Sequence, residues 1–555
     1  MPDNPHIQHI HITLPDGQVQ LLHAGRSLRT LFRDQTVDGL PILGALVNND
    51  LLPLYHPLQC DATVQPVTIA HPQGWRIYRW SLCFLVAKAM HELFPGEKYC
   101  IGHAYGNAIH WSADWSDGQE KTEALERKLR ELVDSDLPIQ YENVPYETAI
   151  ERLTQAGFAD KAKLLAHRNP PYVPLIRCGD FLDLCQGIVA HRTGVLKLFK
   201  LVSTANGFIL NLPESEHPEN IAPLPPFDYL FGVFKEHANW GRIIGISNVS
   251  ELNGAILSGR IRDFVLTAEA LHEKKLASIA DRIASHVPNP RLVLIAGPSS
   301  AGKTTTAKRL MAQLRILGFS PLQLSTDDYF VGDARNPRDS EGRLDYEHIH
   351  AMDLDALNRD VMDLLSGKRV RLARFDFKNR MPGRAEEETF LPENGILVME
   401  GIHSLNPDLT RGIPDDLKFK LFVNAFTQLS IDRNNRIATT DNRLLRRMVR
   451  DWLFRGHGPL ETLRRWPSVL AGEQRWIYPY QHLADAVFNS ALDYELAVLK
   501  RYAAPLLNQV KPVDPLYCEA RRLSGFLQNF VSLDAGYVPG NSLLREHIGG
   551  SQLIY

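Results

Sequence analysis

The residues best suited to chemistry lie at 297–304, where Gly-Pro-Ser-Ser-Ala-Gly-Lys-Thr fits the pattern GxxxxGK[ST]. An apolar run precedes this turn and a helical pattern follows it, which is the context that forms a phosphate-binding loop. Backbone N–H groups and a helix N-terminus present partial positive charge there, and Lys303 adds a full charge. We predict that the phosphates of a nucleoside triphosphate bind to Gly297, Pro298, Ser299, Ser300, Ala301, Gly302, Lys303, Thr304 and Thr305.

Two acidic positions end later apolar stretches. "PLQLSTDDYF" reads as a short strand that leads into Asp327, and "GILVMEGIHSLNP" as another that ends at Glu400. In doubly wound sheets the carboxyl ends of the strands gather at the edge that carries the phosphate loop. Asp327 could there accept a proton from an attacking hydroxyl, and Glu400 with the Thr304 hydroxyl could bind Mg²⁺. An acidic residue at a strand end can also belong to a plain turn, but the nearby phosphate loop favours a role in catalysis or metal binding for Asp327 and Glu400.

Four arginines follow in "DNRLLRRMVRDWLFRGHG". Arg443, Arg446, Arg447 and Arg450 have the spacing i, i+3, i+4, i+7, so they share one face of a predicted helix. The pattern shows few matching acids, and like charges packed this way favour an anionic partner. We expect a mobile lid that closes these side chains over a γ-phosphate. A solvated or nucleic-acid-binding face is the alternative.

The elements that must position these groups have an α/β pattern. A linking helix at 269–287 is predicted to stop at Pro288-Asn289-Pro290, a buried parallel strand follows at 291–296, and "ADAVFNSAL" at 484–492 should be the last core strand. We therefore predict a doubly wound parallel sheet at 276–500, with a helical tail at 501–555. In that tail "RLSGFLQNF" reads as an amphipathic helix. For Arg545 and Glu546 we favour packing over a reach into the site.

Composition limits the class of protein. The chain has 555 residues, 44% apolar and 23% charged, with a net charge of −3, which disfavours nucleic-acid and membrane-surface partners. Six scattered cysteines without a CxxC pair, and no signal-peptide pattern, favour reduced thiols in the cytoplasm. No apolar run reaches membrane-spanning length, and "WSLCFLVAKAM" reads as a buried helix. A homo-oligomer stays open.

The first 70 residues predict a small β-grasp module. "HIQHIHITLPDGQVQLLHAG" alternates around Pro15-Asp16-Gly17 as a β-hairpin does, and "SLRTLFRD" should form a short helix. His6, His9 and His11 suggest a metal site, but a polar strand face is favoured because no cysteine or carboxylate cluster accompanies them.

Residues 71–275 contain "RWSLCFLVAKAMHELFPGEKYCIGHAYGNAIHW" and "VPLIRCGDFLDLCQGIVAHRTGVLKLFKLVSTANGF". These stretches resemble the second additional domain, the editing domain, of threonyl- and alanyl-tRNA synthetases, and the preceding module is similar to their TGS domain. In that domain an HxxxH and a CxxxH form one metal-dependent hydrolytic site. Here those positions hold Trp80, Phe84, Cys185 and Val189, so one ligand survives. His103, His110 and His191 leave a rearranged site near Cys185 open, but a scaffold is favoured.

The C-terminal half resembles the uridine kinase and phosphoribulokinase family, through "GPSSAGKTTTAKRL", "STDDYF", "LDYEHIHAMDLDAL", "RFDFKNR", "MEGIHSLNP" and "RLLRRMVRD". The resemblance implies a P-loop kinase that uses ATP and Mg²⁺. It implies catalytic roles for Asp327 as general base and for Lys303, Arg446 and Arg450 at the phosphates, and acceptor contacts from Asp327, Glu347, Phe375, Arg380 and Arg447.

The sequence departs from that family at the acceptor. Uridine kinases carry a Tyr in "YDF" and a following His, where this chain has Phe375-Asp376-Phe377 and Arg380. Phenylalanine can stack on a base but cannot hydrogen-bond to it. The expected acceptor is a small molecule with a primary hydroxyl, most readily a uridine- or cytidine-like nucleoside, with a non-nucleoside polyol as the alternative. A non-catalytic sensor of ATP or tRNA, and residual aminoacyl-ester hydrolysis, are the other hypotheses.

Overall fold

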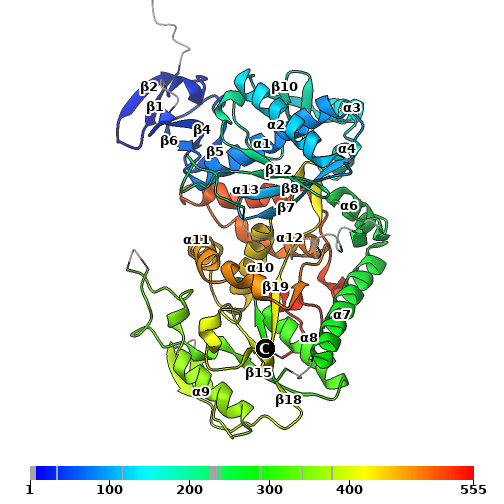
Figure 1. Cartoon of the computed structure of the whole chain (residues 1–555). Helices are drawn as coiled ribbons and strands as arrows, with labels where there is room; N and C mark the ends of the chain where they lie inside the picture. Colours follow the sequence, from blue (N-terminus) through cyan, green and yellow to red (C-terminus); the bar gives the residue numbers. More distant parts are fainter. Residues whose placement is uncertain are drawn as a thin grey trace, which may run out of the picture.

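The computed structural model describes residues 8–554 except 33–35, 116, 225–231, 233–235, 237–238, 242, 287–289, 340–341 and 377–378. The predictions for His6, for Phe377 and for the helix stop at Pro288-Asn289 lie outside the described residues. Figure 1 shows the N-terminal half (blue to cyan) at one end of the molecule and the sheet that carries the phosphate loop at the other.

The first module is a β-sheet with the order β2-β1-β6-β4-β3, in which β5 pairs with β4. Its strands are β1 (His9–Thr13), β2 (Val19–His23), β3 (Thr36–Val37), β4 (Leu40–Val47), β5 (Asp50–Leu52) and β6 (Ala62–Thr68). The antiparallel β1–β2 hairpin confirms the prediction. In β1, Ile10 and Ile12 are buried while His9 and His11 are exposed, as expected of a polar strand face. The short helix predicted after the hairpin is one 3₁₀ turn, Leu28–Thr30.

The second region is built around α1 (Pro72–Leu93), which is buried along most of its length and confirms the buried helix predicted there. Its strands form two antiparallel sheets, with orders β12-β13-β8-β7 and β11-β10-β9. The strands are β7 (Tyr99–Tyr105), β8 (Ala108–Ala113), β9 (Gln140–Pro145), β10 (Tyr172–Cys178), β11 (Phe181–Leu184), β12 (Lys200–Thr204) and β13 (Gly207–Asn211). The further helices are α2 (Gly118–Asp134), α3 (Tyr146–Gln155), α4 (Ala159–Leu165) and α6 (Val249–Leu257).

The C-terminal half contains a five-stranded parallel sheet with the order β15-β18-β14-β19-β22. Its strands are β14 (Leu292–Ala296), β15 (Ser320–Ser325), β18 (Gly395–Glu400), β19 (Lys418–Asn424) and β22 (Ala486–Asn489). This is the predicted doubly wound α/β arrangement. Because β18 lies between β14 and β15, Glu400 ends the strand next to the phosphate loop and Asp327 follows the strand beyond it.

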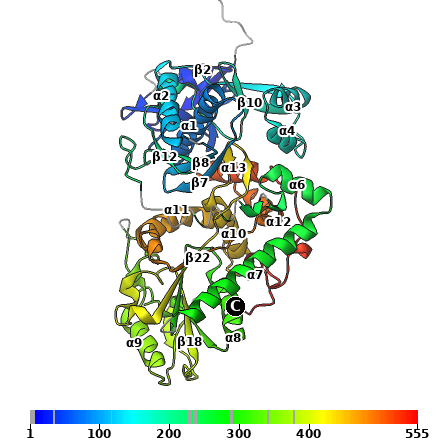
Figure 2. The ribbon, with the colours of Figure 1, turned by 45° about the vertical axis from the view of Figure 1, so that its right-hand side comes forward.

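Alternate residues of β14 face opposite layers of helices. Val293 and Ile295 belong to a core with α7 (Ile261–Ser285) and α8 (Lys303–Ile316), whereas Leu292 and Leu294 belong to a core with α9 (Leu354–Leu365). Figure 2 shows α9 on one side of the strands and α7 with α8 on the other. The strand is buried on both faces, as its continuous apolar run predicts.

Further helices connect the two halves. These are α10 (Thr439–Phe454), α11 (Pro459–Trp476), α12 (Glu495–Leu507), α13 (Tyr517–Leu527) and α14 (Arg545–Ile548). One hydrophobic cluster contains Phe84 of α1, Leu444 of α10 and Leu523 of α13, so both halves share a core. The remaining strands form two small antiparallel ribbons. One joins β16 (Ala373–Asp376) to β17 (Met381–Arg384), and the other joins β20 (Ser430–Asp432) to β21 (Asn435–Arg436). Among the described residues no helix is long and apolar enough to cross a membrane.

Candidate active site

The phosphate loop joins β14 to α8, and two glycines make its path feasible. A Cβ on Gly297 would lie 2.0 Å from the backbone oxygen of Val423, so only glycine lets the loop approach β19. Gly302 has a φ of +81°, in the left-handed region that favours glycine, and a Cβ there would meet Leu543 of the tail. Ser300 also has a positive φ, of 58°, and its buried hydroxyl has no hydrogen-bond partner in the part of the chain that the structure describes. The cradle therefore fits a phosphate group.

The groups expected to hold Mg²⁺ are adjacent. The Thr304 hydroxyl donates a hydrogen bond to Oε1 of Glu400 over 3.2 Å, and the Ser325 hydroxyl donates to the same oxygen over 3.2 Å. These are hard oxygen donors, which Mg²⁺ prefers, and they come from the first turn of α8 and from the ends of β18 and β15, beside the loop. The residues present therefore fit a magnesium ion that also contacts a bound phosphate.

Carboxylates and one lysine share an electrostatic environment at this edge. Burial raises the pKa of Glu400 to about 7, the Lys303 ammonium opposes that rise, and the Asp327 carboxylate adds to it. Burial also raises the pKa of Glu347 to about 7, with Arg447 and Lys303 opposing and Asp327 again contributing. Asp327 and Lys303 thus both lie close enough to change the pKa values of Glu400 and Glu347. The structure brings together four of the site residues that the sequence predicted.

The expectation that the arginines of α10 have few matching acids is wrong. Arg443 makes a bidentate ion pair with Glu473 of α11, at 2.7 and 2.6 Å, and Arg446 pairs with Glu495 of α12 at 2.7 Å. Both arginine side chains are 0% exposed. The mobile lid is also contradicted, because a helix whose charged groups are locked into buried ion pairs is part of the core.

Three of the arginines of α10 have different partners near the phosphate loop. Arg446 donates to the backbone oxygens of Ser300 and Ser490, so it braces the phosphate loop from behind. Arg447, by contrast, donates to the Ser299 hydroxyl over 2.9 Å and lowers the pKa of Glu347, so it borders the site. Arg450 pairs with Asp451, at 3.1 Å. Sequence spacing placed them on one face but did not reveal which of them face the loop.

Two of the predicted acceptor residues, Phe375 and Arg380, lie at the hairpin of β16 and β17. The backbone N–H of Phe375 donates to Asp328 over 3.3 Å, and the Phe375 ring packs edge-on against Phe330 at 5.6 Å. Arg380 is about half exposed and donates to Asp333 at 3.1 Å and to the Tyr346 hydroxyl at 3.4 Å. Phe375 therefore lies in an aromatic cluster, whereas Arg380 is engaged in an ion pair at its rim.

Three residues that sequence reasoning did not place in the site belong to it. Glu473 accepts the Ser299 backbone N–H at 3.2 Å and so links α11 to the phosphate loop. The Thr305 hydroxyl donates to Glu546 of α14, and Glu546 contributes to the raised pKa of Glu400. His403 is buried beside Lys303 and Glu347, and burial lowers its pKa to about 3. Of these three residues, the sequence marks only His403 as a candidate for the site, because it lies three residues after Glu400.

For Glu546 we favoured packing, and the structure corrects that preference. The helix α14 is short, yet its first turn contacts the start of α8, and Leu543 packs against Gly302. The tail therefore forms one wall of the phosphate loop.

In the region that resembles an editing domain, an aromatic ring lies beside Cys185. A Cβ on Gly187 would lie 2.1 Å from the ring of Trp80, so the indole fills the space beside Cys185. The Cys185 thiol donates to the backbone oxygen of Gly187, at 3.1 Å. His110 and His191 are separately buried, and burial lowers the pKa of each to about 4. Within the described parts of the chain no three His, Cys, Asp or Glu residues group as metal ligands.

Comparison with known proteins agrees with the geometry of the phosphate loop. Residues 292–497 match the Phosphoribulokinase / Uridine kinase family. This part of the chain is a domain of that family. The match begins at β14 and ends within α12, so it includes the loop, Asp327, Glu400 and the arginines of α10.

Two solved structures are similar to part of the chain. A possible uridine kinase from Bacillus stearothermophilus is 19% identical, with 39% of this chain and 98% of that chain covered and a TM-score of 0.28. D-glycerate 3-kinase from Cryptococcus neoformans var. grubii is 16% identical, with 49% and 88% covered and a TM-score of 0.20. At these TM-scores neither likeness supports an argument about this chain.

The N-terminal region matches part of threonine–tRNA ligases. The protein from Citrifermentans bemidjiense is 32% identical over 203 residues, which cover 36% of this chain and 32% of that protein. The one from Geobacter sp. strain M21 is 33% identical over 203 residues, with the same coverage. The chain thus spans about a third of the length of these relatives.

Proposed function

We propose that this protein is an ATP- and Mg²⁺-dependent kinase that transfers the γ-phosphoryl group to a primary hydroxyl of a small molecule, most readily the 5′ hydroxyl of a nucleoside. One observation carries the proposal: Glu400 accepts hydrogen bonds from Thr304, next to Lys303, and from Ser325, two residues before Asp327, and both Lys303 and Asp327 act electrostatically on it. A cation for the phosphates and a carboxylate for the acceptor thereby share one site, as phosphoryl transfer requires.

The proposed roles follow from chemistry and position. Lys303 and the backbone N–H groups of the loop hold the β- and γ-phosphates, and Thr304 with Glu400 would hold the metal ion. When bound, Mg²⁺ neutralises charge on the phosphate oxygens. Asp327 accepts the proton of the acceptor hydroxyl while the new oxygen–phosphorus bond forms and the bond to ADP breaks. This chemistry rests mainly on positioning and electrostatics, for which a rigid loop is suited.

Arg447 is the arginine that we propose to contact the transferring phosphoryl group. It borders the loop at Ser299 and lies next to Glu347, whereas Arg446 acts through the loop backbone. Both Arg447 and Arg450 pair with Asp451, but only Arg447 also reaches the loop at Ser299, so Arg450 is assigned a supporting role. Of the three arginines first predicted around the phosphates, this assignment keeps one in direct contact.

The acceptor side supports a flat or sugar-like molecule. The Phe330 ring contacts both Phe375 and Tyr346, at 5.6 and 6.0 Å between ring centres. Such a cluster offers stacking surface, and Glu347 offers a carboxylate for acceptor hydroxyl groups. Since Phe375 lacks a hydroxyl, we expect weaker discrimination among bases than a tyrosine would give.

A screen of phosphate acceptors tests the proposal. The full-length protein, Mg²⁺ and γ-labelled ATP are incubated with single nucleosides, and with ribose, glycerate and fructose as non-nucleoside acceptors. We expect acceptor-dependent release of ADP and a labelled 5′-monophosphate for at least one nucleoside. Labelling of a sugar or sugar acid alone would move the acceptor class to polyols. ADP release that no acceptor stimulates would refute the kinase assignment.

A further inference from the structure

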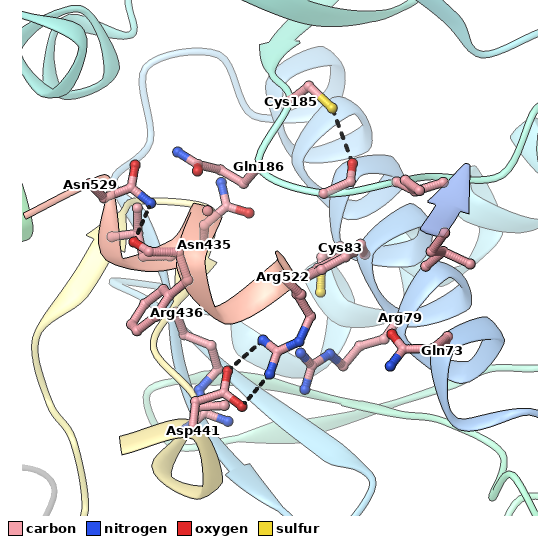
Figure 3. Close-up of a pocket in the computed structure, with 18 of the residues that line it drawn as sticks. Gln73, Arg79, Cys83, Cys185, Gln186, Asn435, Arg436, Asp441, Arg522 and Asn529 are labelled. Carbon is pink, nitrogen blue, oxygen red and sulfur yellow. Dashed lines mark hydrogen bonds and ion pairs between the residues drawn. The ribbon is translucent and has the colours of Figure 1, made fainter. Parts of the chain in front are cut away.

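A second cavity lies away from the phosphate loop, between the N-terminal half and the helices α10 and α13. Its volume is about 280 Å³. It is lined from α1, from the segment after β11, from the β20–β21 ribbon and from α13, so it is formed only when both halves are present. Figure 3 shows the residues that line it. The kinase proposal uses none of the side chains that point into this pocket.

The lining is strongly cationic. Five arginines face the pocket against two aspartates, Asp50 and Asp441; the arginines are Arg79, Arg168, Arg436, Arg521 and Arg522. Arg521 pairs with Asp50 at 2.8 Å, and Arg522 makes a bidentate pair with Asp441 at 2.8 and 2.7 Å. Both aspartates are therefore already committed to those two arginines.

Arg79 and Arg436 lack an ion-pair partner of their own among the described residues. In Figure 3 both side chains converge with Arg522 near Asp441. Burial lowers the pKa of Arg436 to about 10, and repulsion from Arg79 adds to that effect. Two partly buried guanidinium groups that converge on one carboxylate already in an ion pair repel each other in the empty protein. A phosphate group would relieve that repulsion, because it accepts several guanidinium hydrogen bonds at once.

The rest of the wall is apolar and aromatic. Trp80, Ile188 and Phe526 line the pocket beside the arginines. A cavity of this size is just below the usual range for small-molecule sites and matches a ligand the size of one nucleotide. A longer nucleic acid would need an extended cationic surface, and the chain as a whole has a net charge of −3.

We propose that this pocket binds a free nucleoside monophosphate, with the phosphate held by Arg79 and Arg436 and the ring against Trp80. This pocket is separate from the proposed acceptor site and does not depend on the kinase assignment. Its position beside Asp441, in the first turn of α10, places the ligand near the start of the same helix whose Arg446 braces the phosphate loop.

Calorimetric titration of the full-length protein tests the proposal. The probes are UMP, CMP, AMP, GMP, ribose 5-phosphate, inorganic phosphate and a short RNA with a free 3′ end. We expect at least one mononucleotide to bind, and Arg436→Gln to weaken that binding by about tenfold or more. Lys303→Ala, which disables the phosphate loop, should leave the same binding intact. Arg262→Gln, an exposed arginine of α7 outside the pocket, is the matched control.

Stability supplies an independent readout. Because Arg436→Gln removes like-charge repulsion, we expect the ligand-free variant to unfold at a temperature a few degrees higher than the parent. A lower unfolding temperature would show that the guanidinium has a structural role and would overturn the proposal. Three results of the titrations would also overturn the proposal. Mononucleotide binding could be lost in Lys303→Ala but kept in Arg436→Gln. Inorganic phosphate could bind as tightly as any mononucleotide, or the RNA could be the single probe that binds.

Discussion

Replacing Arg446 by alanine separates a bracing role from a catalytic one. The Arg446 guanidinium pairs with Glu495 and donates to the backbone oxygens of Ser300 and Ser490, at 3.3 and 2.9 Å. All of these groups are in the protein interior. The substitution therefore leaves a buried carboxylate without its cation and two buried carbonyl groups short of a donor.

The magnitude follows from that geometry. Breaking a buried ion pair by removing one partner costs about 3–5 kcal/mol, because the remaining charge is uncompensated. Whole domains are stable by only about 5–15 kcal/mol, so Arg446→Ala should lower the unfolding temperature of the C-terminal half by several degrees. The double variant Arg446→Met, Glu495→Leu should recover part of this loss, since it removes both charges.

Thermal unfolding and ATP-binding calorimetry, with Arg447→Ala as the control, decide between the roles. We expect Arg446→Ala to lose stability and ATP affinity together, because the loop backbone loses its brace. Arg447→Ala should lose turnover with a smaller change in stability, since its side chain borders the site. If Arg446→Ala unfolds at the parent temperature and binds ATP normally but does not turn over, the bracing role is refuted.

Three further predictions concern the metal, the tail and the editing-like region. Because burial raises the pKa of Glu400 to about 7 and Mg²⁺ needs the ionised carboxylate, the Mg²⁺ concentration for half-maximal activity should fall as pH rises from 6 to 8; Glu400→Gln should remove this dependence. Glu546→Gln removes a negative charge that helps to raise that pKa, so the same transition should move to lower pH, and an unchanged transition would contradict the contact. Gly187→Ala should destabilise the protein by about 1–3 kcal/mol in denaturant unfolding, since its Cβ would overlap the Trp80 ring, and the pair Gly187→Ala, Trp80→Ala should unfold closer to the parent than Gly187→Ala alone.

Local patterns predicted the elements that hold the site. The run before the phosphate loop, the short strands that lead to Asp327 and Glu400, and the last core strand all formed as predicted, because each depends on hydrophobic periodicity over a few residues. The proximity of Asp327 and Glu400 also followed, since parallel strands end at one edge of a sheet.

Long-range pairing could not be predicted in the same way. The partner of Arg443 is 30 residues away and that of Arg446 is 49 residues away, and nothing in the sequence marks which acids return to α10. Glu546 lies 241 residues after Thr305, at the end of a tail whose path depends on packing alone. For the same reason the cationic pocket is invisible in the sequence, because its arginines come from segments far apart in the chain.

The most direct measurement is the turnover and the ATP affinity of Asp327→Ala, compared with the parent on the acceptor found in the screen. We predict that kcat falls by a factor on the order of 10² or more, while the Kd for ATP with Mg²⁺ changes less than threefold, because Asp327 serves the acceptor and Lys303 serves the phosphates. A variant that turns over like the parent would contradict the assignment of Asp327 as the base, and with it the proposed architecture of the site.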